Sequence, residues 1–188
     1  MTLGGPTFLF FIPLVLGFSF NLASAFTTIF SRKWGERGGS ILTAVLRDIL
    51  GIPVWAIGFG LAAITPSPGL FAPVVATQIL GWFLIGAGGV IILAALITIC
   101  VRAAIPSTVD ALAQDGLYAY VRHPIHSGTL LEFFGLFIII PTQVVALACT
   151  LGIIWVLVQT RLEELDLLQR LPAYREYMQR VPRFVPRF

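Results

Sequence analysis

Both histidines of the chain lie in one short polar segment, residues 115–128, together with Tyr120 and Arg122. Pro124 directly precedes a long apolar run, and proline is tolerated in the first turn of a helix because its missing N–H has no partner there. Arg122 and His123 therefore stand just before the N-terminus of a predicted helix. Free backbone N–H groups and the helix dipole favour an anion at such a position. We expect it to suit the carboxylate of a ligand.

A second polar segment, residues 161–171, continues the last apolar run of the chain into water. Glu163, Glu164 and Asp166 are three acidic side chains in close succession, and they repel one another unless a cation lies nearby. Glu163 and Glu164 diverge by about 100° around a helix. They are therefore not a matched acid–base pair of the glycosidase type, and we expect them to accept an ammonium group and a ribose hydroxyl. The alternative is a solvated helix face with an ion pair between Asp166 and Arg170.

Charged residues inside apolar runs are costly and by default indicate a pocket. Glu132 is such a residue, and it shares a helical face with Gly128, four residues before it. We expect Glu132 to contact the substrate. Arg47 and Asp48 lie inside another apolar run, where we expect them to pair with each other or with a different helix.

Neither a metal motif nor a nucleotide-binding loop is found. His123 and His126 are the only histidines, and no spacing typical of a zinc site is present. Cys100 and Cys149 lie in or beside apolar runs and are expected to be packing residues. Residues 86–89 contain a G-x-G pattern, but small residues in an apolar helix normally mark helix contacts. We therefore predict no metal.

The elements that must position these residues are membrane helices. Of the 188 residues, 57% are hydrophobic and 11% are charged, whereas a soluble domain carries about 25% charged residues. The mean hydropathy is +0.93, and a bilayer-spanning helix needs about 20 apolar residues. The long apolar stretches are residues 7–30, 41–64, 74–101 and 129–160, the last interrupted at Pro141. The last stretch is too long for one span and fits two helices in a tight hairpin. The prediction is an all-α membrane protein with about five spans.

We expect one integral-membrane domain, residues 1–188, with three spans in residues 1–101 and the polar motifs in residues 102–188. All of the 12 Lys and Arg except Arg47 fall in connections that five spans place on one side of the membrane. By the positive-inside rule the N-terminus is outside and the C-terminus cytoplasmic. The sequence Ala-Ser-Ala at 23–25 resembles a signal-peptide cleavage site, but no Lys or Arg precedes the apolar run, so we expect the segment to be retained.

In order and spacing, the two polar segments resemble the signature of the isoprenylcysteine carboxyl methyltransferase and phospholipid methyltransferase superfamily. The first part reads G-x-Y-x-Y-x-R-H-P-x-x-x-G over residues 116–128, and the second reads R-x-E-E-x-x-L over residues 161–167. Y-x-x-Y at 174–177 and V-P-R-F-V-P at 181–186 follow. Two separate motifs in register are much more specific than either alone.

This resemblance implies a methyltransferase that uses S-adenosylmethionine in a pocket facing the cytoplasm, with a lipophilic substrate arriving laterally from the bilayer. The cofactor-binding residues that it implies are Tyr120, Arg122, His123, Pro124, Gly128, Glu163 and Glu164. For a carboxylate acceptor, Arg122 would be the catalytic partner. An amine acceptor would need a base, and Glu132 or His126 would supply it.

The chain departs from the superfamily at His126, where a tyrosine is usual. This histidine is expected either to replace the tyrosine as a local cap or to act as a base. The acceptor stays open among a prenylcysteine carboxylate, a phospholipid amine and a small thiol. An NADPH-dependent reductase of the sterol reductase type and a non-enzymatic transporter or assembly subunit are the alternatives. The expected location is the inner membrane of a bacterium or archaeon, with membrane lipids as partners and no nucleic acid.

Overall fold

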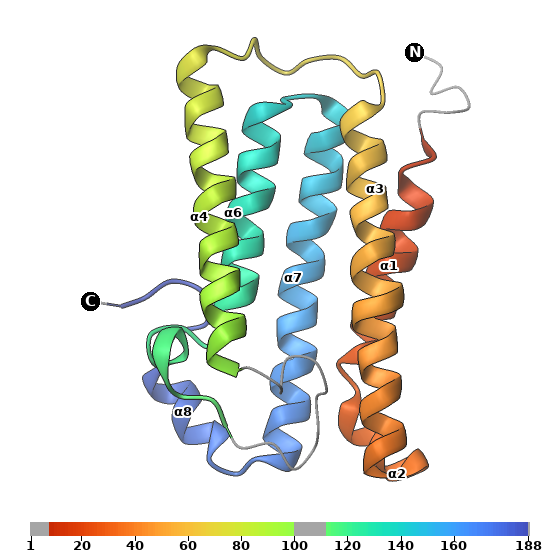
Figure 1. Cartoon of the computed structure of the whole chain (residues 1–188), viewed down its shortest axis with the longest axis vertical. Helices are drawn as coiled ribbons and strands as arrows, with labels where there is room; N and C mark the ends of the chain where they lie inside the picture. Colours follow the sequence, from red (N-terminus) through yellow and green to blue (C-terminus); the bar gives the residue numbers. More distant parts are fainter. Residues whose placement is uncertain (1–7, 100–111, 188) are drawn as a thin grey trace.

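The computed structural model describes residues 8–99 and 112–187, which form a bundle of helices (Figure 1). Its elements are α1 (Phe11–Ser24), α2 (Thr27–Ala44), the π-helix η2 (Val45–Gly51), α3 (Ile52–Ile64), α4 (Val75–Ile99), the 3₁₀-helix η3 (Gly116–Ala119), α6 (Pro124–Ile139), α7 (Gln143–Arg170) and α8 (Tyr174–Arg180). Among the described residues the only extended pairing is an isolated bridge between Gly69 and Thr142. The predicted all-α class is therefore confirmed. Cys100 and the cation Arg102 lie outside the described residues.

Within residues 8–99 and 112–187, three helical runs are long and apolar enough to cross a membrane: residues 27–64, α4 and α7. The apolar helices α1 and α6 are shorter, with 14 and 16 residues. At 1.5 Å per residue each would measure about 21–24 Å, against a hydrocarbon core of about 30 Å. The chain is an integral membrane protein in which these five apolar elements pack together.

The first predicted stretch, residues 7–30, is not one helix. Helix α1 ends at Ser24, and α2 begins at Thr27 after a short break. The N–H groups of Ala25 and Phe26 donate to carbonyls three residues back, both at 3.2 Å, which is the tighter bonding typical of a helix end. The break could not be predicted from the sequence, because the apolar composition continues across it.

The chain reverses direction at Gly35, in the connection between the predicted apolar stretches 7–30 and 41–64. This connection is helical except at Gly35, whose φ is +74°. Glycine adopts a positive φ at little cost. In Figure 1 the chain descends through α1, turns at α2 at the foot of the bundle and ascends through α3.

The predicted hairpin in the last apolar stretch is confirmed. Helices α6 and α7 are joined through Pro141 and Thr142, and Thr142 Oγ1 accepts the N–H of Val145 at 3.3 Å, capping α7. Helix α7 then continues without a break to Arg170. The second polar segment is therefore the end of a long helix, as predicted.

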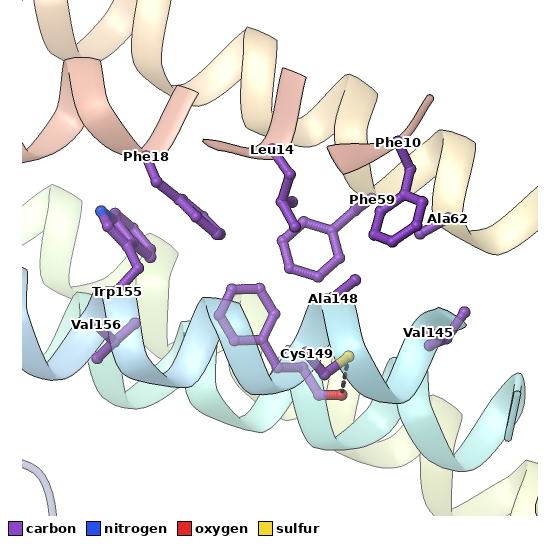
Figure 2. Close-up of a cluster of buried hydrophobic side chains, with 11 residues drawn as sticks. Phe10, Leu14, Phe18, Phe59, Ala62, Val145, Ala148, Cys149, Trp155 and Val156 are labelled. Atoms are coloured by element: carbon purple, nitrogen blue, oxygen red, sulfur yellow. Dashed lines mark hydrogen bonds between the residues drawn. The ribbon is translucent and has the colours of Figure 1, made fainter. Parts of the chain in front are cut away.

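An aromatic core joins α1, α3, α6 and α7 (Figure 2). The rings of Phe18 and Trp155 stack at 4.9 Å between centroids, and those of Phe59 and Phe133 at 4.8 Å. The Cys149 thiol donates to the carbonyl of Phe133 at 3.3 Å, so Cys149 is a packing residue, as predicted. This core holds the N-terminal helices against the motif-bearing hairpin.

Helices α4 and α6 approach closely at two glycine pairs. A Cβ added at Gly128 would lie 2.6 Å from the carbonyl oxygen of Gly88, and one added at Gly135 would lie 2.7 Å from that of Gly81. Small residues permit such backbone contact between membrane helices. The helix contact predicted for residues 86–89 is therefore confirmed at Gly88.

Candidate functional site

The C-terminal tail lies along the first polar segment and fixes its backbone. The N–H groups of Arg122 and His123 donate to the carbonyls of Pro182 and Arg183 at 2.8 and 3.1 Å. One turn later, the Ser127 hydroxyl donates to a further tail carbonyl at 2.8 Å. The start of α6 and the tail are therefore one unit, although about 60 residues separate them in the sequence.

Glu164 is fully buried between two arginines. Arg122 Nη2 donates to Glu164 Oε1 at 2.8 Å, and Arg183 Nε donates to the same oxygen at 3.0 Å. Arg183 Nη2 also donates to Glu164 Oε2, and these bonds raise the pKa of Arg183. Arg122 Nη1 donates to the carbonyls of Met178 and Val181. Glu164 thus joins α7, the start of α6 and the tail.

The adjacent Glu163 has a different environment, with a side chain that is 30% exposed. Gln159, one turn earlier on α7, donates its amide to Glu163 Oε1 at 2.7 Å. His123 lies between the two glutamates, its Nδ1 3.5 Å from Glu163 Oε2 and its Nε2 3.4 Å from Glu164 Oε1. Burial alone lowers the pKa of His123, but contact with both carboxylates outweighs it, and the pKa is raised.

Glu163, His123 and Arg122 line a cavity of about 400 Å³ in the half of the bundle that holds α2 and α8. One wall comes from α4, α6 and α7, and the other comes from α1, α2, η2 and α3. The polar side chains of the cavity outside the two motifs include Asn21, Ser24, Thr27, Thr43 and Gln159. The cavity therefore has both charged and neutral hydrogen-bonding groups.

The sequence model of the phospholipid methyltransferase family matches residues 76–174, which is more than half of the chain. The chain belongs to the phospholipid methyltransferase family. It is therefore a membrane methyltransferase of a family that acts on lipid-related substrates. No curated protein and no solved structure matches the chain. The family match covers α4, α6 and α7 and leaves α1, α2 and α3 outside.

The structure separates the residues that the sequence placed in one site. Arg122, His123 and Glu163 line the cavity, whereas Glu164 is fully buried behind them. The Tyr120 side chain is 61% exposed and is not among the residues that line the cavity.

The remaining predicted site residues lie along α6. Pro124 is fully buried at its first position. Gly128 and Glu132 face α4, where a Cβ at Gly88 would lie 2.8 Å from Glu132 Cγ. These three residues are therefore positioned to hold α6 in place, and none of them lines the cavity.

The predicted ion pair between Asp166 and Arg170 is present at 3.1 Å, but this part of α7 is not simply a solvated face. Asp166 is buried and lines the cavity, and its Oδ1 accepts the N–H of Thr28 at 3.0 Å. The predicted pair of Arg47 and Asp48 is also present, at 2.8 Å. Both pairs line the cavity, the first from α7 and the second from η2.

Sequence reasoning missed the part of α7 that precedes the acidic motif. Trp155, Gln159 and Glu163 recur every four residues and all line the cavity. A spacing of four places side chains on one face of a helix, so this spacing was a usable signal. Asn21 and Ser24 were the corresponding signal on α1, because polar residues inside an apolar helix commonly face a cavity.

Two buried tyrosines, Tyr174 and Tyr177, and the half-buried Tyr118 predict a loss of stability at alkaline pH. Burial raises the pKa of Tyr177 to about 12, and it also raises the pKa of Tyr118 and Tyr174. Below pH 10 both folded and unfolded states hold these protons, so stability does not change. Above pH 10 the unfolded state releases them first, and each tyrosine lowers the free energy of unfolding by about 1.4 kcal/mol per pH unit.

Thermal unfolding in detergent across pH 9–12 measures this slope. Tyr177→Phe is expected to make the slope shallower by about 1.4 kcal/mol per pH unit, because one titrating group is gone. It also removes the hydrogen bond from Tyr177 to the carbonyl of Tyr118, at a pH-independent cost of about 1 kcal/mol. Tyr120→Phe, at an exposed side chain, is the control. Equal slopes in wild type and Tyr177→Phe would contradict the prediction.

Proposed function

We propose that the chain transfers the methyl group of S-adenosylmethionine to a lipophilic acceptor in this cavity. The observation that carries the proposal is a cavity with a carboxylate and several buried polar atoms that lack partners. Gln159 Oε1, Trp55 Nε1 and Trp155 Nε1 are buried without a hydrogen-bond partner, and all three residues line the cavity. Buried polar atoms are normally satisfied. A ligand rich in polar groups would supply the missing partners.

The donor set fits the zwitterionic end of this cofactor. Glu163 would accept the ammonium group, with Gln159 Oε1 as a second acceptor. The start of α6 and the cations Arg122 and Arg170 would attract the carboxylate, because a helix N-terminus and a guanidinium both favour an anion. When bound, the cofactor supplies a methyl group activated by a sulfonium, and the protein contributes orientation and water exclusion.

The acceptor proposed here is a lipid-related molecule with a carboxylate, amine or thiol nucleophile. The cavity also has an apolar part, lined by Ile52, Ile92, Leu96 and Ile99. It suits the hydrocarbon chain of an acceptor that enters from the bilayer. Such a path would bring a lipophilic acceptor to the polar end without passing through water.

We also propose that five segments span the membrane and that the cavity faces the cytoplasm. Figure 1 places α2 and α8 at one end of the bundle and the connections 65–74 and 140–142 at the other. The first end carries Arg32, Lys33 and Arg37 together with the arginines of the C-terminal region, whereas the two connections contain no Lys or Arg. By the positive-inside rule, this distribution supports a cytoplasmic location for the end that holds α2 and α8.

Calorimetric titration of the detergent-purified protein tests the proposal. S-adenosylmethionine and S-adenosylhomocysteine are expected to bind, and NADPH is expected not to bind. Glu163→Gln should weaken binding by about 10–100-fold, because a hydrogen bond to a charged group contributes about 1.5–3 kcal/mol. Glu176→Gln removes an acid that is 77% exposed on α8 and should leave affinity unchanged. Folded protein that binds neither sulfur nucleotide would overturn the proposal, and binding of NADPH alone would favour a reductase.

A further inference from the structure

Two histidines and a carboxylate converge on one wall of the cavity. His123 and His126 lie one turn apart at the start of α6, and Glu163 reaches them from α7. One ligand atom from each residue can be chosen so that all three lie within 4.8 Å of one another. All three side chains line the cavity.

This donor set matches the chemistry of a transition-metal site. Two imidazole nitrogens and one carboxylate oxygen are typical ligands of catalytic zinc, at about 2.0–2.2 Å from the metal. Ligand atoms around a tetrahedral ion at that distance lie about 3.4 Å from one another. His123 Nδ1 and Glu163 Oε2 are already 3.5 Å apart. Small rotations of the His126 side chain would complete the set.

The surroundings orient the ligands as metal sites require. Gln159 donates to Glu163 Oε1 at 2.7 Å and leaves Oε2 directed toward His123. The other nitrogen of His123, Nε2, is buried without a hydrogen bond and lies 3.4 Å from Glu164 Oε1. Histidines that bind a metal almost always donate their second N–H to a carboxylate or carbonyl. Glu164 is in position to accept it.

The charges around this position also permit a cation. Arg122 and Arg183 are hydrogen-bonded to Glu164. Of the other arginines that line the cavity, Arg47 pairs with Asp48 and Arg170 with Asp166. Their charge is therefore partly compensated, while Glu163 faces the histidines with a carboxylate oxygen.

We propose that His123, His126 and Glu163 bind one divalent ion of the Zn²⁺ class, with an open coordination position toward the cavity. Three protein ligands leave such a position in catalytic zinc sites. An oxygen or sulfur atom of a molecule in the cavity can occupy it. Glu163 belongs to both proposals, so a metal ion and the ammonium group of the nucleotide would compete for its carboxylate. Each is therefore tested in the absence of the other.

Uptake of Co²⁺ by the full chain in detergent tests this site. After treatment with a chelator, the protein is titrated with Co²⁺ and followed by visible ligand-field absorption and by metal content per chain. We expect one Co²⁺ per chain and displacement by Zn²⁺. His126→Tyr, which keeps a polar ring, and His126→Gln should each weaken Co²⁺ binding at least 100-fold. Glu176→Gln, an exposed carboxylate on α8, is the control and should bind Co²⁺ as the wild type does.

The two proposals fail separately in this design. Wild-type protein that takes up no stoichiometric Co²⁺ overturns the metal site, and so does unchanged uptake in both His126 variants. S-adenosylmethionine is titrated in parallel into the metal-free protein. Nucleotide binding without metal uptake overturns the metal site alone, and metal uptake without nucleotide binding overturns the proposed function alone.

Discussion

Glu164→Gln is expected to lower the free energy of unfolding in detergent by about 3–5 kcal/mol. Glu164 is fully buried and accepts hydrogen bonds from Arg122 and Arg183. A neutral amide in its place would leave two guanidinium groups near each other without a compensating charge. Removing one partner of a buried ion pair typically costs that amount, because the remaining charge stays desolvated. Thermal and denaturant unfolding measure the loss.

The adjacent residue provides a matched control. Glu163→Gln makes the same chemical change one position earlier, at a side chain that is 30% exposed and faces the cavity. We expect it to change stability by about 1 kcal/mol. Adding Arg183→Gln to Glu164→Gln should recover part of the loss, since one uncompensated charge is removed. Equal stability of Glu163→Gln and Glu164→Gln would contradict the assigned difference.

This difference between adjacent glutamates could not be predicted from the sequence. A separation of about 100° around the helix shows that the two side chains point in different directions. It does not show which one faces the cavity and which faces the arginines. That depends on where α6 and the tail pack against α7. Arg183 lies in the tail motif V-P-R-F-V-P at residues 181–186. Its hydrogen bond to Glu164, however, joins residues that are 19 positions apart in the sequence.

The helices were predictable where the sequence carries a clear stop signal. Pro141 divides the last apolar stretch, and the hairpin of α6 and α7 follows from it. By contrast, nothing in the composition marks the end of α1 at Ser24. A break of two apolar residues costs little in hydropathy, so it is invisible to a rule based on length.

The metal ligands illustrate the same limit. His123 and His126 alone, three residues apart, are too few for a zinc motif, so the sequence predicts no metal. Glu163 comes from another helix, 37 residues after His126 in the sequence. Only the packing of α6 against α7 brings the three side chains together. The spacing of residues within one segment therefore does not predict sites whose ligands come from two different helices.

Gly128→Leu is expected to destabilise the protein by about 3 kcal/mol and to weaken cofactor binding with it. A Cβ at this position would lie 2.6 Å from the carbonyl oxygen of Gly88 and 2.7 Å from Ile92 Cγ1. Backbone cannot yield as the end of a side chain can, so α4 and α6 would have to separate. Overpacking of this kind costs about 1–3 kcal/mol, and a bulky side chain against backbone lies at the upper end.

Separation of these helices would also displace the cavity wall. Thr129 and His126 lie on either side of Gly128 and line the cavity, as does Ile92 on α4. Gly86→Leu is the control, because a Cβ there meets no atom within 4 Å and leucine favours a helix over glycine by about 0.5–1 kcal/mol. Unfolding and nucleotide titration of both variants measure the two effects. If Gly128→Leu were as stable as Gly86→Leu, α4 and α6 would not be in backbone contact at this glycine, and the position of α6 in the cavity wall would need another support.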